Sequence, residues 1–478
     1  MKKLICIICC ALFLPLFSSC KSEGEEGANY RLNLVLNEDM TVDGSMEYSF
    51  TAEFENQSYI TFNLYPNAFS ENATVSPVFE RDIPSAYPNG FSGGKVDILT
   101  VKTNGKTADF EIGGVNSQFL KAKFSSPLKR GEKASVYVEF KCLLPNVNHR
   151  FGYGEDTVNL TGFYPIACVY ENGEFIQNVY YPSGDPFYSE CADYDVSLTV
   201  PSTYTVASSM AVEKTIWSGG QTEYVYKRDC VRDIAFVLSE KFNVLKGEAN
   251  GVEVTYYYYS DSAPEKTLQT AVDAIDFFSS TYYEYPYGEY AVCQADFLYG
   301  GMEYPCLSLV SDAVGEYLDY TVAHETAHQW FYGIIGVNES EIGYLDEGLT
   351  ELSTACFMDG REGKTYRDYI LEAENSYEAI KSSLTYLGIT TPPVMERNLK
   401  DFSSELEYVM IAYNRSEIAF DRVKSRLSDK LFFKTMKKFI KNNAFSNVTT
   451  SDLTKAFERA KRGTGEFLKG YVDGVTAI

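Results

Sequence analysis

Residues 321–331, TVAHETAHQWF, decide how the rest of the chain is interpreted. They contain the motif His-Glu-x-x-His, formed by His324, Glu325 and His328. Residues four apart on a helix lie one above the other on the same face, so both imidazoles can bind one ion. Glu325 comes one position after His324 and points beside that ion, where a base that activates water must lie. The motif therefore predicts a zinc site of the hydrolytic kind.

The plain alternative is a helix whose histidines only pack against a buried surface. The chain has 3 histidines, and two of them fall in this motif. Paired histidines without a ligand would leave costly buried donors, which favours the metal site over the packing alternative. Two histidines and a water leave a zinc site incomplete, so a third protein ligand is expected downstream.

Glu347 follows His328 after eighteen intervening residues, in the stretch GYLDEGLTEL. HETAHQWF followed by LDEGL at this spacing resembles the gluzincin aminopeptidases, the family of aminopeptidase N and leukotriene-hydrolysing enzymes. The resemblance implies that Glu347 is the third ligand of one Zn²⁺ ion; the alternative is an ordinary exposed acid. Glu351, one turn further along the same face, either orients a zinc-bound histidine or faces solvent.

The segment GGMEY, which contains Gly301, Met302 and Glu303, resembles the family's glycine-x-methionine-glutamate-asparagine signature. In the family, this edge strand pairs with the substrate backbone, and its glutamate holds the free α-amine. The resemblance implies that Gly301 and Met302 line the cleft and that Glu303 binds the amine. On the residues alone, a glycine turn before another strand fits equally well, and Tyr304 replaces the family's asparagine.

A tyrosine about sixty-five residues after the third ligand donates a hydrogen bond to the reaction's oxyanion in the family. Tyr413 lies sixty-six residues after Glu347, with Arg415 and Ser416 where the family has Lys-Gly. We expect Tyr413 to take this role, and Tyr408 is the rival.

Two domains are expected in a chain of 478 residues. Strand-like runs between turn residues, with hairpin signals at Asp43-Gly44 and Asn104-Gly105, predict an antiparallel β domain over residues 30–246. Helical periodicity then begins, and the resemblance implies a mainly α, thermolysin-like zinc peptidase domain over residues 247–478. The expected fold class is therefore α+β and multidomain.

Residues 1–20 predict a signal peptide, because Lys2 and Lys3 precede an apolar run too short to span a bilayer. Small residues before Cys20 resemble a bacterial lipoprotein signal, in which Cys20 becomes the lipidated first residue. Phe17 departs from the usual leucine, and an ordinary secretory signal is the alternative. Residues 21–29 are polar and glycine-rich, as in a flexible tether. We expect an exported lipoprotein of the bacterial cell envelope.

The formal net charge of −24 restricts the partners. It disfavours nucleic acid and charge-driven binding to an anionic membrane, so membrane contact is expected only through the lipid anchor at Cys20. The cysteines after residue 20 have no C-x-x-C spacing, which argues against a metal site built from cysteine.

The predicted activity is release of single N-terminal residues from peptides with a free N-terminus. Glu325 would act as general base, Tyr413 would stabilise the oxyanion, and Glu303 would bind the amine. One alternative is a zinc endopeptidase or other hydrolase in which Glu303 is only structural. Another is a surface lipoprotein that binds peptides without catalysis.

Overall fold

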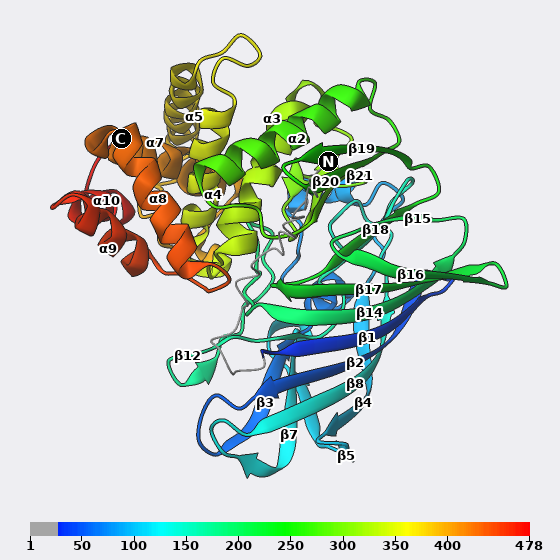
Figure 1. Cartoon of the computed structure of the whole chain (residues 1–478). Coiled ribbons are helices and arrows are strands. Elements are labelled where there is room, and N and C mark those ends of the chain that lie inside the picture. The colour runs from blue at the N-terminus through cyan, green and yellow to red at the C-terminus, as the bar shows by residue number, and fades with distance from the viewer. Residues whose placement is uncertain (1–26) are drawn as a thin grey trace, which may run out of the picture.

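The computed structural model describes residues 27–478. The predicted signal peptide, Cys20 and most of the predicted tether therefore lie outside the described residues. A β-rich half precedes a mainly helical half, and the two lie side by side in Figure 1. This arrangement confirms the predicted α+β class. No helix within residues 27–478 is both long and apolar enough to cross a membrane.

An eight-stranded sheet spans the β half, in the order β16-β17-β14-β1-β2-β8-β4-β5. Its neighbouring strands are antiparallel except for β1 and β14, which run parallel. Buried and more exposed residues alternate along β1 and β14, so one face of the sheet covers a core. The strands are β1 (Asn29–Leu36), β2 (Thr41–Thr51), β4 (Lys95–Thr103), β5 (Lys106–Thr107), β8 (Lys133–Leu143), β14 (Ala192–Pro201), β16 (Ala211–Ser218) and β17 (Gln221–Val231).

Two four-stranded sheets, β15-β18-β10-β9 and β11-β3-β7-β6, accompany the large sheet. Aromatic rings pack between the sheets; Tyr48 of β2 meets Phe62 of β3 edge to face, with ring centroids 5.7 Å apart. The strands are β3 (Gln57–Asn63), β6 (Phe110–Gly113), β7 (Phe119–Leu128), β9 (Gly152–Tyr153), β10 (Val158–Thr161), β11 (Ile166–Ala167), β15 (Thr205–Ser208) and β18 (Ala235–Ser239). A short hairpin joins β12 (Tyr170–Glu171) and β13 (Glu174–Phe175).

The hairpin expected at Asn104-Gly105 is confirmed, since both residues have positive φ values, 50° and 75°, between β4 and β5. The prediction of a turn at Asp43-Gly44 is wrong. Gly44 lies inside β2, paired with Leu34 on one side and Phe140 on the other. A Cβ on Gly44 would overlap the Phe140 ring, so this glycine makes room for an aromatic neighbour instead of forming a turn.

The second half begins with a five-stranded sheet in the order β19-β20-β21-β23-β22. Strands β20, β21 and β23 are parallel, and β22 is an antiparallel edge strand. The boundary expected between residues 246 and 247 falls inside β19. The strands are β19 (Asn243–Ala249), β20 (Val252–Tyr258), β21 (Glu289–Ala295), β22 (Gly301–Met302) and β23 (Leu307–Ser311).

Helices complete this half, and two π-helical segments interrupt them. The segment η5 (Gln329–Ile334) directly follows α3, and η7 (Val409–Arg415) precedes α7. Helix α4 packs against both α3 and α7. The helices are α2 (Pro264–Thr281), α3 (Leu318–His328), α4 (Glu339–Phe357), α5 (Tyr366–Tyr386), α6 (Glu405–Tyr408), α7 (Ser416–Leu427), α8 (Asp429–Asn443), α9 (Thr450–Ala460) and α10 (Thr464–Val472).

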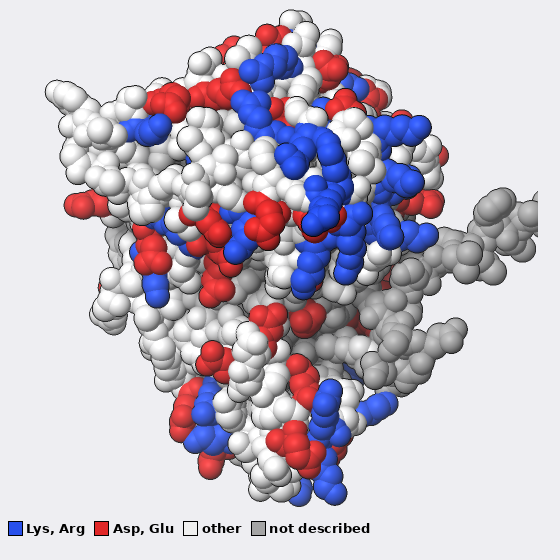
Figure 2. Space-filling view, turned by 90° about the vertical axis from the view of Figure 1, so that its left-hand side faces the viewer, with Lys and Arg blue, Asp and Glu red and all other residues white. Residues whose placement is uncertain are grey.

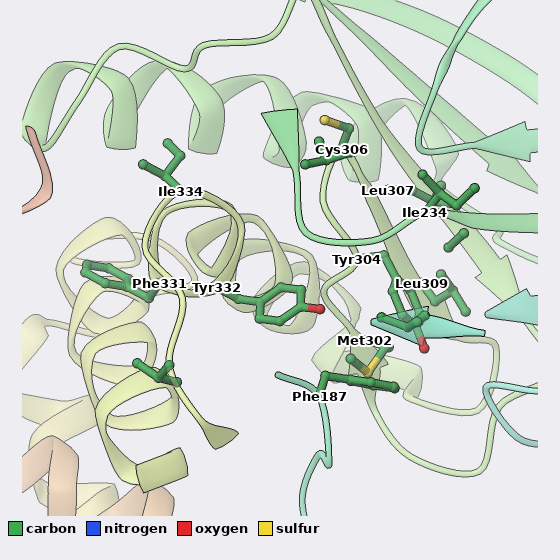
Figure 3. Packing of buried hydrophobic residues seen from close by; sticks show 14 of the residues in the cluster. Phe187, Ile234, Met302, Tyr304, Cys306, Leu307, Leu309, Phe331, Tyr332 and Ile334 are labelled. Carbon is green, nitrogen blue, oxygen red and sulfur yellow. The ribbon is translucent and has the colours of Figure 1, made fainter. Parts of the chain in front are cut away.

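Apolar packing joins the two halves. Figure 3 shows Phe187 of the β half beside Met302 and Tyr304 of the other half. The rings of Phe187 and Tyr304 are 6.0 Å apart between centroids. The Tyr304 hydroxyl also donates to Thr161 Oγ1 in β10 at 2.7 Å. Tyr304 therefore links the five-stranded sheet to the β half.

Arg232 forms a polar clamp between the halves and is only 1% exposed. From the loop after β17, its guanidinium donates to the carbonyl of Tyr332 at 2.8 Å and to that of Ser446 at 2.9 Å. It also donates to the Ser189 carbonyl and the Asn447 side chain. A Cβ on Gly336 would overlap this guanidinium, so the glycine is required by the clamp.

We expect Arg232→Met to lower the free energy of unfolding by about 3 kcal/mol or more, because several buried acceptors lose their donor. Urea denaturation followed by tryptophan fluorescence measures the loss. Arg130→Met, at an exposed position, is the control and should change stability by less than about 0.5 kcal/mol. Equal midpoints for the two variants would contradict the clamp.

Candidate metal centre

Two neighbouring helices bring the predicted ligands together. His324 and His328 lie in the last turns of α3, and Glu347 lies in the middle of α4. The Nε2 atoms of the two histidines are 3.0 Å apart. Glu347 Oε2 is 3.4 Å from Nε2 of His324 and 3.3 Å from Nε2 of His328. The three atoms thus form a nearly equilateral triangle.

This triangle fits a zinc ion. Ligand atoms about 2.05 Å from one tetrahedral ion lie about 3.3 Å apart, which matches the observed separations. Glu347 Oε2 is buried and has no hydrogen-bond partner within residues 27–478, as expected of an atom that faces a cation. Two imidazole nitrogens and one carboxylate are also a usual donor set for catalytic zinc.

The electrostatic field of the site favours positive charge. Burial alone would lower the pKa of His324, but the carboxylates of Glu351 and Glu347 raise it to about 10. Burial likewise opposes a charged Glu347, yet His328 and His324 lower its pKa to about 2. Glu347 therefore stays ionised and available to bind a cation throughout the neutral range.

Further acids hold the two rings from their other sides. Asp346 Oδ1 lies 2.8 Å from Nδ1 of His328, and Thr350 Oγ1 lies 3.1 Å from the same nitrogen. Glu351 Oε1 lies 3.3 Å from Nδ1 of His324. Such contacts fix the ring orientation and leave each Nε2 free to bind metal. The structure thus places Glu351 beside His324. From the sequence alone, a solvent-facing side chain was the alternative.

Glu325 lies between the triad and strand β22. It is buried, and its Oε2 has no hydrogen-bond partner in the described part of the chain. Burial raises its pKa to about 7. A Cβ on Gly301 would overlap the Glu325 carboxylate, whereas one on Gly300 would meet nothing closer than Thr321 Cγ2 at 3.9 Å. Gly301 is therefore the position that allows this carboxylate to approach the edge strand.

A cluster of three acids, Asp185, Glu303 and Glu339, lies next to the triad, and we call it the acid pocket. Gly301 and Met302 form β22, as the resemblance implied for an edge strand, and Glu303 follows directly. One oxygen each from Asp185, Glu303 and Glu339 lies within 4.8 Å of the others. Glu303 is 4% exposed and Glu339 is 2% exposed. Another group of the same kind joins Glu303 to His328 and Asp346, so the acid pocket adjoins the metal centre.

The acid pocket contains more buried carboxyl groups than the surrounding residues pair. Arg150 forms an ion pair with Asp185, but Oε1 of Glu303 and both oxygens of Glu339 have no hydrogen-bond partner among the described residues. Burial raises the pKa of Glu303 and of Glu339 well above the usual range. Carboxylates in this condition gain stability from any cation that enters the pocket.

The π-helical segment η7 brings Tyr413 to the triad. Its hydroxyl donates to Glu347 Oε1, and its ring stacks on that of His324 with centroids 6.1 Å apart. The rival, Tyr408, is more deeply buried and packs beside Gly184 and Gly343. The structure therefore brings Tyr413 into direct contact with a predicted zinc ligand.

Three residues of the site were not predicted from the sequence: Asp185, Glu339 and Asp346. Asp346 directly precedes Glu347, and this adjacency was the available signal. Glu339 lies at the start of α4 and looks like an ordinary surface acid in the sequence. Asp185 comes from the β half, and only the packing of the two halves brings it to Glu303.

Comparison with known families gives a match to the peptidase family M1 domain over residues 266–471. Leukotriene A-4 hydrolase of Xenopus laevis is 26% identical over 212 residues, which are 43% of this chain and 33% of that protein. Probable aminopeptidase 2 of Sulfurisphaera tokodaii is 22% identical over 414 residues, 80% of this chain and 49% of that protein. The chain thus spans at most about half the length of these relatives.

Solved structures resemble the whole described fold. The M1 zinc metallopeptidase from Deinococcus radiodurans superposes with a TM-score of 0.67 at 15% identity, covering 95% of this chain and 94% of that one. A mutant of that protein bound to a Tyr-Ser-Ala substrate gives a TM-score of 0.65 at 14% identity, with 95% and 94% covered. Residues 266–471 of the chain thus match a peptidase family M1 domain, and the described fold as a whole resembles that of two-domain M1 zinc metallopeptidases.

Proposed function

We propose that the protein is a zinc aminopeptidase that releases single N-terminal residues from peptides. The observation that carries this proposal is the acid pocket of Asp185, Glu303 and Glu339 directly beside the triad of His324, His328 and Glu347. The relatives with aminopeptidase names and the tripeptide-bound structure of the Deinococcus protein support it.

The triad would hold the zinc ion, with Asp346 and Glu351 keeping the two rings in place. When bound, zinc supplies Lewis acidity, which polarises a carbonyl and makes water more acidic. Glu325 would accept the proton of the attacking water and return it to the leaving amine. A carboxylate with a pKa raised by burial is suited to both transfers, because proton affinity near neutrality serves base and acid alike.

Tyr413 would stabilise the oxyanion that develops on the scissile carbonyl. Its hydroxyl donates to Glu347 in this structure, so the donor is already held at the triad. A rotation of the hydroxyl toward the substrate oxygen would supply the hydrogen bond. One such donor typically contributes about 10²- to 10³-fold in rate.

The acid pocket would bind the substrate's α-ammonium. Three acceptors at about 2.8 Å from one ammonium nitrogen, in tetrahedral directions, lie about 4.6 Å apart. One oxygen each from Asp185, Glu303 and Glu339 lies within 4.8 Å of the others, so the three are close enough to share one ammonium. An ammonium there fixes the first peptide bond at the triad, which makes the enzyme an exopeptidase. A peptide without the free amine would leave buried carboxylates unpaired.

The proposal predicts that N-acetylation of an aminoacyl fluorogenic substrate lowers kcat/KM by about 10³-fold or more. Glu303→Gln should lower kcat/KM for the free-amine substrate by about 10- to 100-fold, because one charged hydrogen bond weakens. The exposed Glu316→Gln is the matched control and should change neither value. Initial rates over a range of substrate concentrations measure these effects.

Two further arms separate the alternatives. Equal cleavage of free and acetylated substrates would identify an endopeptidase or another hydrolase. A chelator should abolish turnover, and Glu325→Gln should lower kcat by about 10²-fold or more while zinc content stays unchanged. A protein that only binds peptides would show no turnover to lose.

Gly301→Ala should lower kcat by about 10²-fold, because the added methyl group displaces the Glu325 carboxylate. Gly300→Ala is the adjacent control and should retain activity within about two-fold, since its methyl group meets only Thr321 at van der Waals distance. Steady-state kinetics, with metal content and melting temperature measured in parallel, test the pair. Full activity of Gly301→Ala would show that Glu325 does not act from its position beside β22.

We also propose export to the cell envelope and anchoring through a lipid on Cys20, from the resemblance of residues 1–20 to a lipoprotein signal. Expressed in a bacterial host, the protein should remain in the membrane fraction after a high-salt wash. Cys20→Ser should release it, whereas Cys10→Ser should not. Release of both the unsubstituted protein and Cys10→Ser by the same wash would favour an ordinary secretory signal.

A further inference from the structure

Helix α8, helix α9 and the residues just after α9 form a strongly basic surface in an otherwise acidic protein. Residues 429–462 contain nine Lys and Arg against three Asp and Glu, whereas the whole chain has a net charge of −24. Figure 2 shows a band of Lys and Arg side chains on this side of the molecule. We call this surface the basic face; its cations are Lys430, Lys434, Lys437, Lys438, Lys441, Lys455, Arg459, Lys461 and Arg462.

The three acids of this segment are occupied elsewhere. Asp429 forms an ion pair with Lys424 at 2.9 Å. Asp452 caps helix α9, where its carboxylate accepts the Thr449 hydroxyl at 2.7 Å. Glu458 accepts the backbone N–H groups of the turn that follows α9. The local acids therefore do little to neutralise the cations of the basic face.

A groove between α8 and α9 gathers four of these cations. It has a volume of about 500 Å³. Its cationic wall consists of Lys434, Lys438, Lys455 and Arg459, which are exposed and form no ion pair with any described residue. One acid, Asp452, also lines the groove, and its carboxylate accepts the Thr449 hydroxyl. The other lining residues add polar groups and apolar surface: Thr435, Asn442, Asn443, Leu431, Phe439, Ala456 and Ala460. Such a lining suits a negatively charged group attached to an apolar one.

We propose that the basic face binds the phosphate-bearing headgroups of an anionic lipid bilayer. Nine cations, seven on the two helices and two just after α9, match an extended charged surface better than one small anion. The groove accommodates a headgroup phosphate among its four cations, with the apolar side chains beside it. Local charge near the bilayer dominates because electrostatic interactions with distant acids are screened within about 10 Å. The net charge had suggested the opposite, since it averages over the whole chain.

Co-sedimentation of the full-length zinc-loaded protein with vesicles tests the proposal. Vesicles of phosphatidylcholine alone are compared with vesicles that also contain phosphatidylglycerol, so that binding through any lipid anchor cancels in the ratio. The basic-face variant carries Lys434→Ala, Lys438→Ala, Lys455→Ala and Arg459→Ala. The control variant removes the same charge from exposed lysines elsewhere, with Lys106→Ala, Lys129→Ala, Lys214→Ala and Lys400→Ala.

The unsubstituted protein and the control variant should prefer the anionic vesicles. The basic-face variant should lose on the order of 10²-fold in partition coefficient to them, with peptidase activity unchanged. Equal binding to the two kinds of vesicle, or an equal loss in both variants, would overturn the proposal. Binding of polyglutamate or nucleic acid without vesicle binding would also overturn it, in favour of an acidic macromolecule. The outcome is independent of the proposed catalysis.

Discussion

The structure around the candidate metal centre depends on compensation of buried negative charge. Five carboxylates are buried within a small volume, those of Glu303, Glu325, Glu339, Asp346 and Glu347. Burying isolated carboxylates is strongly unfavourable unless cations or hydrogen-bond donors meet them. The histidines supply part of this compensation, and Arg150 forms an ion pair with the neighbouring Asp185. On the proposed function, the remainder is met by a divalent ion at the triad and by a substrate ammonium in the acid pocket.

Local spacing explains why the triad could be predicted. His324 and His328 are four residues apart on one helix, and this geometry is fixed by the helix itself. Glu347 required the resemblance, because nothing in the spacing alone shows that α4 packs on α3. The role of Glu351 could not be decided from the sequence for the same reason. Its position beside His324 depends on the packing of the two helices, not on either sequence stretch.

The remaining residues of the site could not be predicted because they converge through long-range packing. Asp185 comes from the β half and Glu339 from the first turn of α4, and their sequence surroundings resemble those of ordinary surface acids. The incorrect prediction of a turn at Asp43-Gly44 has a similar origin. A glycine is needed at position 44 because the ring of Phe140 on another strand leaves no room for a side chain. A turn signal read from neighbouring residues in the sequence does not include that contact. The antiparallel β half as a whole depended on repeated local signals and was predicted correctly.

The Arg232 clamp has a consequence for access to the candidate metal centre. Because one guanidinium bridges the β half, segment η5 and the loop after α8, separating the two halves would break its buried hydrogen bonds. On the proposed function, a peptide must then bring its N-terminal end to the triad while the two halves stay together. The flexibility of the first few residues of a substrate, more than its total length, would then decide whether it is cleaved. Folded proteins with buried N-termini would not be cleaved.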